Sequence, residues 1–241
     1  AMVARSAVFT AAPSIERDGL YNGNYFYAPA FRSERQGRWA GTVKKYCIEP
    51  ARNSAGSYDT DDRRCIFASD DGHTLMTNPV AEDLWTGTTT TAADQGGAGL
   101  LMLSALGTAG GTPGSNPWGR RRLQSWRPGT AAYVDVTPST WTADDSNSSG
   151  LGHHKLVNLL HGYTYDANAD GTPKLISEWP YGDTIHVPTA LLRYGADCQV
   201  AGQCFLVVGA NDGQLHVHDA ATGVETTALI PAELWRPLGV A

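Results

Sequence analysis

Charged residues are scarce in this 241-residue sequence, at 17% of the chain, and the acidic ones are in excess, which gives a net charge of −6. Nucleic-acid binding is driven by Lys and Arg displacing counterions from phosphates, so this balance argues against a nucleic-acid partner. No apolar stretch approaches the length of a membrane span, and the first residues lack the sustained apolar core of a signal peptide. We therefore expect no nucleic acid and no membrane span.

Arginine is concentrated in one basic cluster, formed by Arg120, Arg121, Arg122 and Arg127. At the spacing of a β-strand its members point alternately to the two faces, so they do not gather into one phosphate-binding patch. We expect a solvated or ion-paired strand edge here.

Motifs of catalysis are missing as well. The sequence has no G-x-S-x-G nucleophile motif and no glycine-rich loop that cradles phosphate. Asp183 and His186 could be imagined as a catalytic dyad, but a buried hydrogen-bonded pair that fixes a turn is the simpler interpretation. His216 and His218 share one strand face, yet no third ligand for a transition metal is evident, so packing is favoured. The same holds for the histidines of a short helical stretch, which are His153, His154 and His161. We expect a protein that is not an enzyme.

Cysteine occurs only four times, without a Cys-x-x-Cys or Cys/His zinc pattern. The residues form two local pairs, Cys47 with Cys65 and Cys198 with Cys204. Four cysteines allow three connectivities, and the local one closes the two shortest loops. Closing the longer of these stabilises by about 3 kcal/mol in the chain-entropy model. The pattern predicts two disulfides and an oxidising compartment outside the cytoplasm. The alternative is four buried free thiols.

Glycine and proline are plentiful, with 27 and 13 residues, and this favours many short strands and loops over long helices. The first strands are expected around residues 25–28 and 39–47, with a turn at 33–37. Hairpins are expected at Asp71-Gly72 and at Pro128-Gly129. Two short helices are predicted as well. The first lies within residues 93–107, where Leu100, Leu101, Leu103 and Leu106 approximate one face, and the second covers His154–His161.

The most informative stretch runs from Phe205 to Leu234 and reads FLVVGANDGQLHVHDAATGVETTALIPAEL. The apolar run Leu206–Val208 is typical of a strand that is buried on both faces, and Asn211-Asp212-Gly213 supplies a turn. Beyond this turn, Leu215 and Val217 share one face and polar residues share the other. A second turn, Ala-Thr-Gly, leads into the strand ETTALI. Three short meandering strands indicate a β-propeller blade, whose apolar faces need neighbouring blades to cover them.

These residues also carry a resemblance to a known family. Residues 208–234 resemble the most recognisable segment of the type IV pilus tip-associated adhesin and biogenesis factors, the PilY family, in their carboxy-terminal β-propeller. LVNLLHGY and YGDTIHVP are similar to that family's Leu-Val-Asn-x-x-x-Gly and Gly-Asp-Ile-x-His-Ser-x-Pro elements. NYFYAPAF with GRWAGTVKKYCI is similar to the strands that open its propeller. Thr226-Thr227 departs from the family, which often has an apolar residue and Trp there, and the family's propeller continues beyond the last residue of this chain.

The resemblance implies a mainly β fold: a partial β-propeller of short antiparallel meander blades, with long loops and one or two short helices. Residues 1–241 would form a single propeller-like domain, an incomplete fragment of a larger propeller. The implied function is that of a non-enzymatic cell-surface protein of the type IV pilus system, a tip adhesin or a factor in pilus assembly and retraction. Its partners would be minor pilins or other pilus components and a host or abiotic surface. Its location would be extracellular, at the pilus tip, with the outer membrane or periplasm passed in transit.

A calcium-binding loop is suggested by DANADGT, which matches the motif opening D-x-N-x-D-G. Oxygen side chains at alternate positions can converge on one hard cation, and Gly permits the sharp turn. Lys174 and Ser177, however, occupy the ninth and twelfth positions, and a bidentate Glu is expected at the twelfth. The family's propeller is associated with a calcium loop, which favours the calcium interpretation over a polar loop rich in Asx turns. The predicted Ca²⁺ ligands are Asp166, Asn168, Asp170 and Thr172.

Two other function classes stay open at this point. A quinoprotein dehydrogenase has propeller blades with similar Asp-Gly and Ala-Thr-Gly turns that end in Trp, and it predicts several copies of that motif. The sequence contains one copy, which lacks the Trp. A structural subunit of an extracellular filament is the other alternative.

Overall fold

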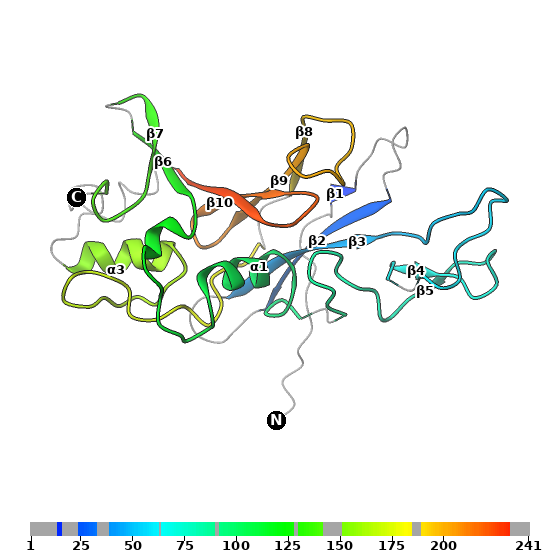
Figure 1. Ribbon diagram of the computed structural model, residues 1–241, viewed down its shortest axis with the longest axis horizontal. Helices are drawn as coiled ribbons and strands as arrows, with labels where there is room; N and C mark the ends of the chain where they lie inside the picture. The colour runs from blue at the N-terminus through cyan, green and yellow to red at the C-terminus, as the bar shows by residue number, and fades with distance from the viewer. Residues whose placement is uncertain are drawn as a thin grey trace.

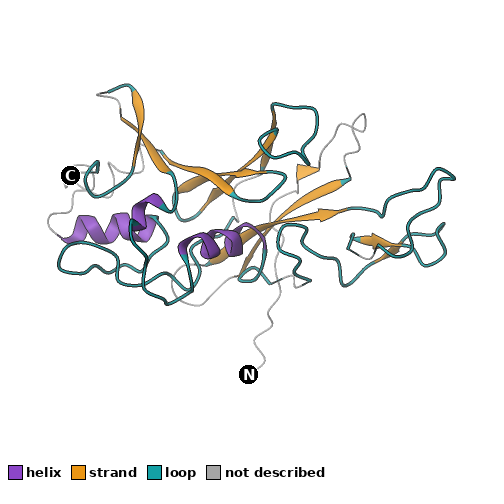
Figure 2. Cartoon of the chain, viewed as in Figure 1, coloured by secondary structure: helices purple, strands orange, loops and turns teal. Residues whose placement is uncertain are grey.

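The computed structural model describes residues 14–15, 24–32, 39–62, 64–89, 92–127, 130–141, 151–184 and 189–231. In this part of the chain the protein is mainly β, with two short α-helices joined to the strands by long loops (Figure 1, Figure 2). The strands are β1 (Ser14–Ile15), β2 (Tyr25–Arg32), β3 (Ala40–Cys47), β4 (Phe67–Ala68), β5 (Met76–Thr77), β6 (Leu123–Arg127), β7 (Ala132–Asp135), β8 (Ala190–Arg193), β9 (Cys204–Ala210), β10 (Gln214–Asp219) and β11 (Glu225–Ile230). The helices are α1 (Gly97–Leu106) and α3 (Leu151–Leu160), with a 3₁₀ turn η1 (Pro117–Gly119) between them.

The amino-terminal sheet has the order β1-β2-β3, and its strands are antiparallel. The expected pair of strands is confirmed, whereas its turn at residues 33–37 lies outside the described residues. All eight residues of β3 are buried, because both faces of the strand are covered. Thr42 accepts a hydrogen bond from the Gly99 amide of α1 on one face (3.0 Å), and Val43 packs into the core on the other.

The second sheet has six strands in the order β7-β6-β11-β10-β9-β8. Strands β8 to β11 follow one another as an antiparallel meander, so β8 extends the expected three-stranded blade. Strand β6 joins the open side of β11 in parallel, with Leu123 opposite Ala228. Within the described ranges the sheets do not close into a ring, so the meander is observed and the propeller stays a prediction.

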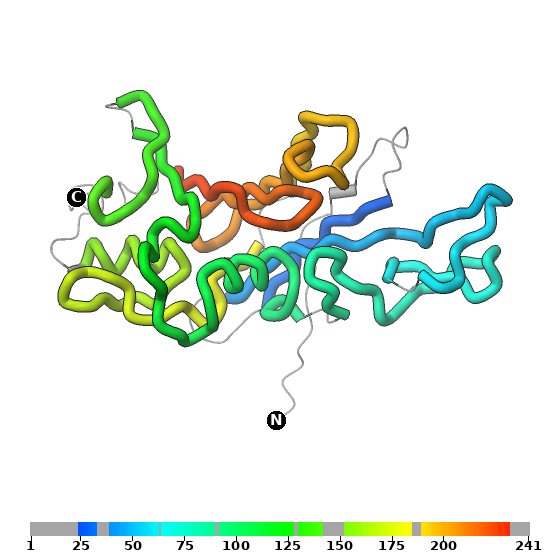
Figure 3. Tube along the Cα trace, in the orientation of Figure 1, coloured from blue at the N-terminus to red at the C-terminus, as the bar shows by residue number. Residues whose placement is uncertain are grey.

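The main core lies where the two sheets face each other, and the chain trace shows the blue amino-terminal strands beside the orange carboxy-terminal ones (Figure 3). Tyr27 and Val43 of the first sheet contact Leu206 and Val208 of the second, and all four are fully buried. A second cluster packs α3 against β6 and β11, with Val157, Leu123 and Ile230 among its members. These contacts join segments from the two ends of the chain.

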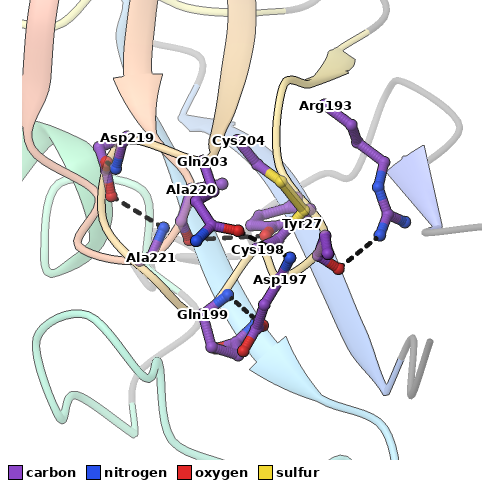
Figure 4. The surroundings of a disulfide bond; sticks show 12 residues. Tyr27, Arg193, Asp197, Cys198, Gln199, Gln203, Cys204, Asp219, Ala220 and Ala221 are labelled. Carbon is purple, nitrogen blue, oxygen red and sulfur yellow. Dashed lines mark hydrogen bonds between the residues drawn. A yellow bond between two sulfur atoms is a disulfide. The ribbon is translucent and has the colours of Figure 1, made fainter.

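Both disulfides predicted from the sequence are present. Cys47 is bonded to Cys65 with a Cα–Cα distance of 4.6 Å, and Cys198 to Cys204 with one of 5.0 Å. No cysteine is free, so the alternative of four buried thiols is wrong. The second disulfide belongs to the core between the sheets, where it lies beside Tyr27 and Ala220 (Figure 4).

Helix α1 forms where it was predicted, but it buries a different face. The residues turned to the core are Ala98, Met102 and Leu106, whereas Leu100, Leu101 and Leu103 are only half-buried. Gly99 explains the choice of face, because a Cβ atom at this position would lie 2.3 Å from Trp179 Cζ2. Close approach of the helix to Trp179 requires small residues, so the glycine–alanine side faces inward. Neither α1 nor α3, each of ten residues, is long enough to cross a bilayer.

Both predicted hairpins are found as strand pairs. Strands β4 and β5 are two residues each, and Asp71 fixes their connection by accepting hydrogen bonds from the His73 and Thr74 amides (2.8 and 2.7 Å). Strands β6 and β7 pair from Gln124 to Arg127, and their predicted turn at 128–129 lies outside the described residues.

Candidate functional site

The polar face of β10 is its buried face. Gln214, His216 and His218 are at most 3% exposed, whereas Leu215 and Val217 on the opposite side are half-buried. An alternating strand ordinarily turns its apolar side to the core. This reversal requires that each buried polar group find a partner, because an unsatisfied one costs about 1–3 kcal/mol.

A β-bulge at the start of β11 supplies one of these partners. Val217 lies opposite Thr227, but the next residue of β10, His218, lies opposite Glu225, so Thr226 is the extra residue. Without the bulge, the two-residue period would turn the Glu225 side chain to the other face. The bulge thus aims a carboxylate at the buried side, at the site where the sequence departs from the PilY-type pattern.

Glu225 forms a buried ion pair with Arg121, which lies just before β6. The Nε and Nη2 atoms of Arg121 donate to the two carboxylate oxygens at 2.7 and 2.9 Å, and the two side chains are 2% and 7% exposed. Arg121 also donates to Gln214 Oε1 (2.8 Å) and to the Leu160 carbonyl (2.9 Å). Burial would raise the pKa of Glu225, but the charges and hydrogen bonds of Arg121 and His216 together outweigh burial and hold this pKa well below its usual value.

His216 lies between two carboxylates. Its Nδ1 is 2.7 Å from Glu225 Oε1 and its Nε2 is 3.2 Å from Asp212 Oδ2. Burial alone would lower the pKa of His216, but these two acceptors raise it above its usual value. With both ring nitrogens donating, His216 is an imidazolium. Around His216, two cations, Arg121 and His216, then face two anions, Glu225 and Asp212.

Tyr181 and His218 complete the buried network. The Tyr181 ring stacks on His216 with centroids 4.4 Å apart, and its hydroxyl is 3.1 Å from His218 Nε2. The other nitrogen of His218, Nδ1, lies 3.1 Å from the Gly223 carbonyl, which can only accept a hydrogen bond. His218 is therefore neutral, with the proton on Nδ1, and burial lowers its pKa to about 4.

The loop at residues 181–184 is locked to the β9–β10 turn by the same group of residues. The Gly182 amide donates to Asp212 (3.0 Å), and Asn211 Nδ2 donates to Asp183 Oδ1 (2.7 Å). Asp183 is buried, as expected for a residue that fixes a turn, and it accepts a hydrogen bond from Asn211. The expected partner, His186, lies outside the described residues. We define this set, with Arg121, Glu225, His216, Gln214, Tyr181 and His218, as the buried polar cluster.

The interactions within the buried polar cluster serve to hold the fold together. Its acids and bases are hydrogen-bonded to one another and nearly excluded from solvent. Among the residues that the structure describes, no group of three or more His, Cys, Asp or Glu side chains is arranged to hold a metal ion. The cluster instead fixes three segments against each other: the end of α3, the loop at 181–184 and the β9–β11 meander.

The predicted calcium loop is well ordered by bonds within itself. Asp170 Oδ1 accepts from the Thr172 amide and hydroxyl (3.0 and 2.7 Å), and Asn168 Nδ2 donates to Thr172 Oγ1 (3.0 Å). Asp166 forms an ion pair with Lys174 at 2.9 Å. The donor set suits a hard cation, and in this structure Asp170 bonds within the loop and Asp166 pairs with Lys174. Calcium would have to displace Lys174 from Asp166, and the calcium site stays a prediction.

Several important residues were not identified from the sequence. In the basic cluster Arg121 is ion-paired as expected, but it is buried ahead of β6 and does not lie on a strand edge, while Arg120 and Arg122 are exposed. Lys44 and Lys45 of β3 are each 1% exposed and were not singled out. The alternation of side chains along an extended chain could have indicated the burial of Arg121, since one of three consecutive arginines has to face the opposite side from its neighbours.

The chain was compared with protein-family models, with curated proteins and with solved structures, and no match was found. The resemblance of residues 208–234 to the PilY-type propeller accordingly stays a hypothesis that is based on motifs.

Proposed function

We propose that this chain is a non-enzymatic extracellular protein of the type IV pilus system, which acts by binding partners through loops on a rigid β scaffold. It would serve as a tip adhesin or as a factor in pilus assembly and retraction. Minor pilins or other pilus components, and a host or abiotic surface, would be its partners. This proposal includes the partial β-propeller, of which the four-stranded meander would be one blade.

The observation that supports it most is the convergence of the three motif patches on the buried polar cluster. LVNLLHGY contributes the Leu160 carbonyl, YGDTIHVP contributes Tyr181 and Gly182, and the carboxy-terminal segment contributes Asp212 and His216. Motifs that matched by chance would have no reason to meet in space. Their contacts therefore support one structural unit of the kind that the resemblance implies.

The two disulfides support the location. Such bonds form and persist in oxidising compartments, so they indicate a protein that is exported from the cytoplasm. Loops that a disulfide connects to a strand, as at residues 48–62 and 199–203, are a common way to present binding residues on a β scaffold. Calcium at residues 166–172 belongs to the same proposal, as a ligand that would reorganise a surface loop.

Deletion of the gene in the source organism tests the proposal. We expect fewer surface pili by electron microscopy and a smaller zone of surface motility, both restored by the parent gene. A gene with Asp212→Ala, which breaks the lock between residues 182 and 212, should restore neither, while Arg120→Gln on an exposed arginine should restore both. Unchanged pilus number and motility after deletion would overturn the pilus assignment, and a bound quinone with dye-linked alcohol oxidation would favour the dehydrogenase.

A further inference from the structure

A pocket of about 740 Å³ lies where the loops of the two disulfides meet. One wall is the Cys47–Cys65 bridge with the loop that it closes, and the facing wall is Gln199, which follows Cys198 in the second bridged loop. Tyr25 and Lys45 line the pocket from the first sheet. Segments from three parts of the chain thus enclose one space, which lies apart from the buried polar cluster and from the predicted calcium loop.

The residues that line this pocket are held in place by disulfides and hydrogen bonds within the protein itself. Besides its disulfide, the first loop is fixed by Asn24, whose side chain donates to the Glu49 carbonyl (2.5 Å) and accepts from the Glu49 amide (2.9 Å). In the second loop the Gln199 amide donates to Asp197 Oδ1 (2.8 Å), directly beside the Cys198–Cys204 bond (Figure 4). A preorganised pocket loses little conformational entropy on binding, which favours affinity for a small ligand.

Positive charge exceeds negative charge in the pocket lining, although the chain as a whole has a net charge of −6. Lys45 is almost fully buried, and its ammonium donates to Gln199 Oε1 (2.8 Å) and to the Ala220 carbonyl (2.9 Å). The three cationic residues are Lys45, Arg52 and Arg64, and the two carboxylates are Glu49 and Asp62. Asp62 forms a bidentate pair with Arg64 (3.0 and 3.2 Å) and Glu49 forms an ion pair with Arg52 (3.7 Å), so both carboxylates are matched and one cationic residue is in excess.

Polar groups dominate the rest of the lining. The amide of Gln199 and the carboxylates of Glu49 and Asp62 can exchange hydrogen bonds with hydroxyl groups, which both donate and accept. The Tyr25 ring is half-buried, and the Lys45 ammonium lies 4.8 Å from its centroid. Few large apolar side chains are present, so an aliphatic ligand would find little surface to bury.

We propose that this pocket binds an acidic saccharide, with the sugar carboxylate held by Lys45 and Arg52 and the sugar hydroxyls by the polar groups around them. Charge-assisted hydrogen bonds to a lysine or an arginine are among the strongest single contacts that a small ligand can make. The inference depends on the pocket alone and is independent of the pilus assignment. A normal pilus phenotype in the deletion strain would leave it standing.

Titration with digalacturonate tests it, followed by ligand-observed NMR or calorimetry. We expect saturable binding to the parent protein and no binding of the neutral digalactose. Arg52→Gln removes an exposed cation of the pocket and should weaken binding about tenfold, as the loss of one charge-assisted hydrogen bond predicts. Arg120→Gln removes the same charge from an exposed position elsewhere and should leave the affinity unchanged.

A second variant for the same test is Lys45→Met, on condition that its circular dichroism spectrum and melting temperature match those of the parent. It should weaken digalacturonate binding at least as much as Arg52→Gln does. If Lys45→Met does not fold, the digalacturonate affinities of Arg52→Gln and Arg120→Gln decide the test. Two results would overturn the proposal: no saturable binding at millimolar digalacturonate, or equal affinity for the diglutamate peptide, which shares the charge but not the hydroxyls.

Discussion

Arg121 and Glu225 are 104 positions apart in the chain, and they form a bidentate ion pair that is nearly sealed from solvent. The pair connects a residue two positions before β6 to the first residue of β11, the strand that lies beside β6 in the sheet. His216 binds the same carboxylate, so Glu225 receives two cationic donors. The stability of the meander therefore depends on charges that the surrounding protein keeps paired.

Replacement of Arg121 should be strongly destabilising. Arg121→Met leaves the Glu225 carboxylate buried with one cationic partner fewer, and breaking a buried pair in this way costs about 3–5 kcal/mol. The double variant Arg121→Met with Glu225→Met should recover part of this loss, because no unmatched carboxylate remains. Urea unfolding measures both, and Arg120→Met at the exposed neighbour should change the free energy of unfolding by less than about 0.5 kcal/mol. Equal effects at positions 120 and 121 would contradict the buried pair.

Stability should fall as the pH is lowered from about 6.5 to about 4. Burial lowers the pKa of His161 and of His218 to about 4, so in this window the unfolded chain binds more protons than the folded protein. Each residue contributes on the order of 3 kcal/mol across it. The raised pKa of His216 has the opposite sign and adds no loss below 6.5, and the lowered pKa of Glu225 adds a further loss once the pH falls below its ordinary value of 4.5.

Urea unfolding at several pH values, for the parent and for His161→Gln, checks this prediction. The variant removes one titrating group, so its free energy of unfolding should depend less steeply on pH between 6.5 and 4. His73→Gln is the control, because His73 is exposed and should leave the slope as it is. A His161→Gln slope identical to that of the parent would show that His161 does not titrate abnormally.

Gly41 should not tolerate a side chain. A Cβ atom there would lie 2.0 Å from the Gly182 carbonyl oxygen, at the bridge between β3 and the loop at 181–184. Gly41→Ala should destabilise by about 3 kcal/mol, since the backbone of the loop would have to move. Gly56→Ala is the comparison: no atom lies within 4 Å of its Cβ position, so only its φ of 83° opposes alanine, at about 1 kcal/mol. Thermal melting distinguishes the two, and a milder effect at Gly41 would contradict the close approach.

The two disulfides should contribute unequally. Cys47 and Cys65 are separated by 18 positions and Cys198 and Cys204 by six. The chain-entropy model gives about 3 kcal/mol for the longer loop and about 2 kcal/mol for the shorter one. Paired replacement of each bridge by alanines, followed by urea unfolding, measures the two contributions. A larger effect for the shorter loop would mean that packing of Cys198 and Cys204 in the core outweighs loop closure.

Calcium binding at residues 166–172 should be limited by Lys174, whose ammonium pairs with Asp166. Lys174→Gln should therefore bind calcium more tightly than the parent, and Asp170→Ala should bind it more weakly. Isothermal titration measures all three proteins, with Arg120→Gln as a control for the change in net charge. If neither the parent nor Lys174→Gln gives heat with calcium, the loop is a polar turn and not a metal site.

The strands of the meander, the helices and the disulfide pairs could be predicted because each depends on local signals. Asn211-Asp212-Gly213 marks a turn by its tolerance of positive φ, and Gly213 indeed has a φ of 81°. The pairing of Cys198 with Cys204 needs only a short loop. Such features are encoded within a few residues, so the sequence specifies them without knowledge of the tertiary structure.

The inward polar face of β10 could not be predicted. A two-residue period shows that Gln214, His216 and His218 share a face, but it does not show which face is buried. That outcome depends on Arg121, far away in the sequence, and on a bulge at Thr226 that reverses the side on which Glu225 lies. Lys44 and Lys45 pose the same difficulty, because β3 is covered from both sides by segments that follow it much later in the chain.

The parallel pairing of β11 with β6 has a consequence for how the protein reaches its fold. Ser125 of β6 donates to the Ile230 carbonyl across a separation of 105 residues, so this edge of β6 stays unpaired until β11 has been made. Such distant partners meet slowly, because a long loop has to close first. During synthesis and export, one edge of the β6–β7 hairpin therefore has unpaired backbone amides and carbonyls. A chaperone that covers this edge would protect the nascent chain from aggregation.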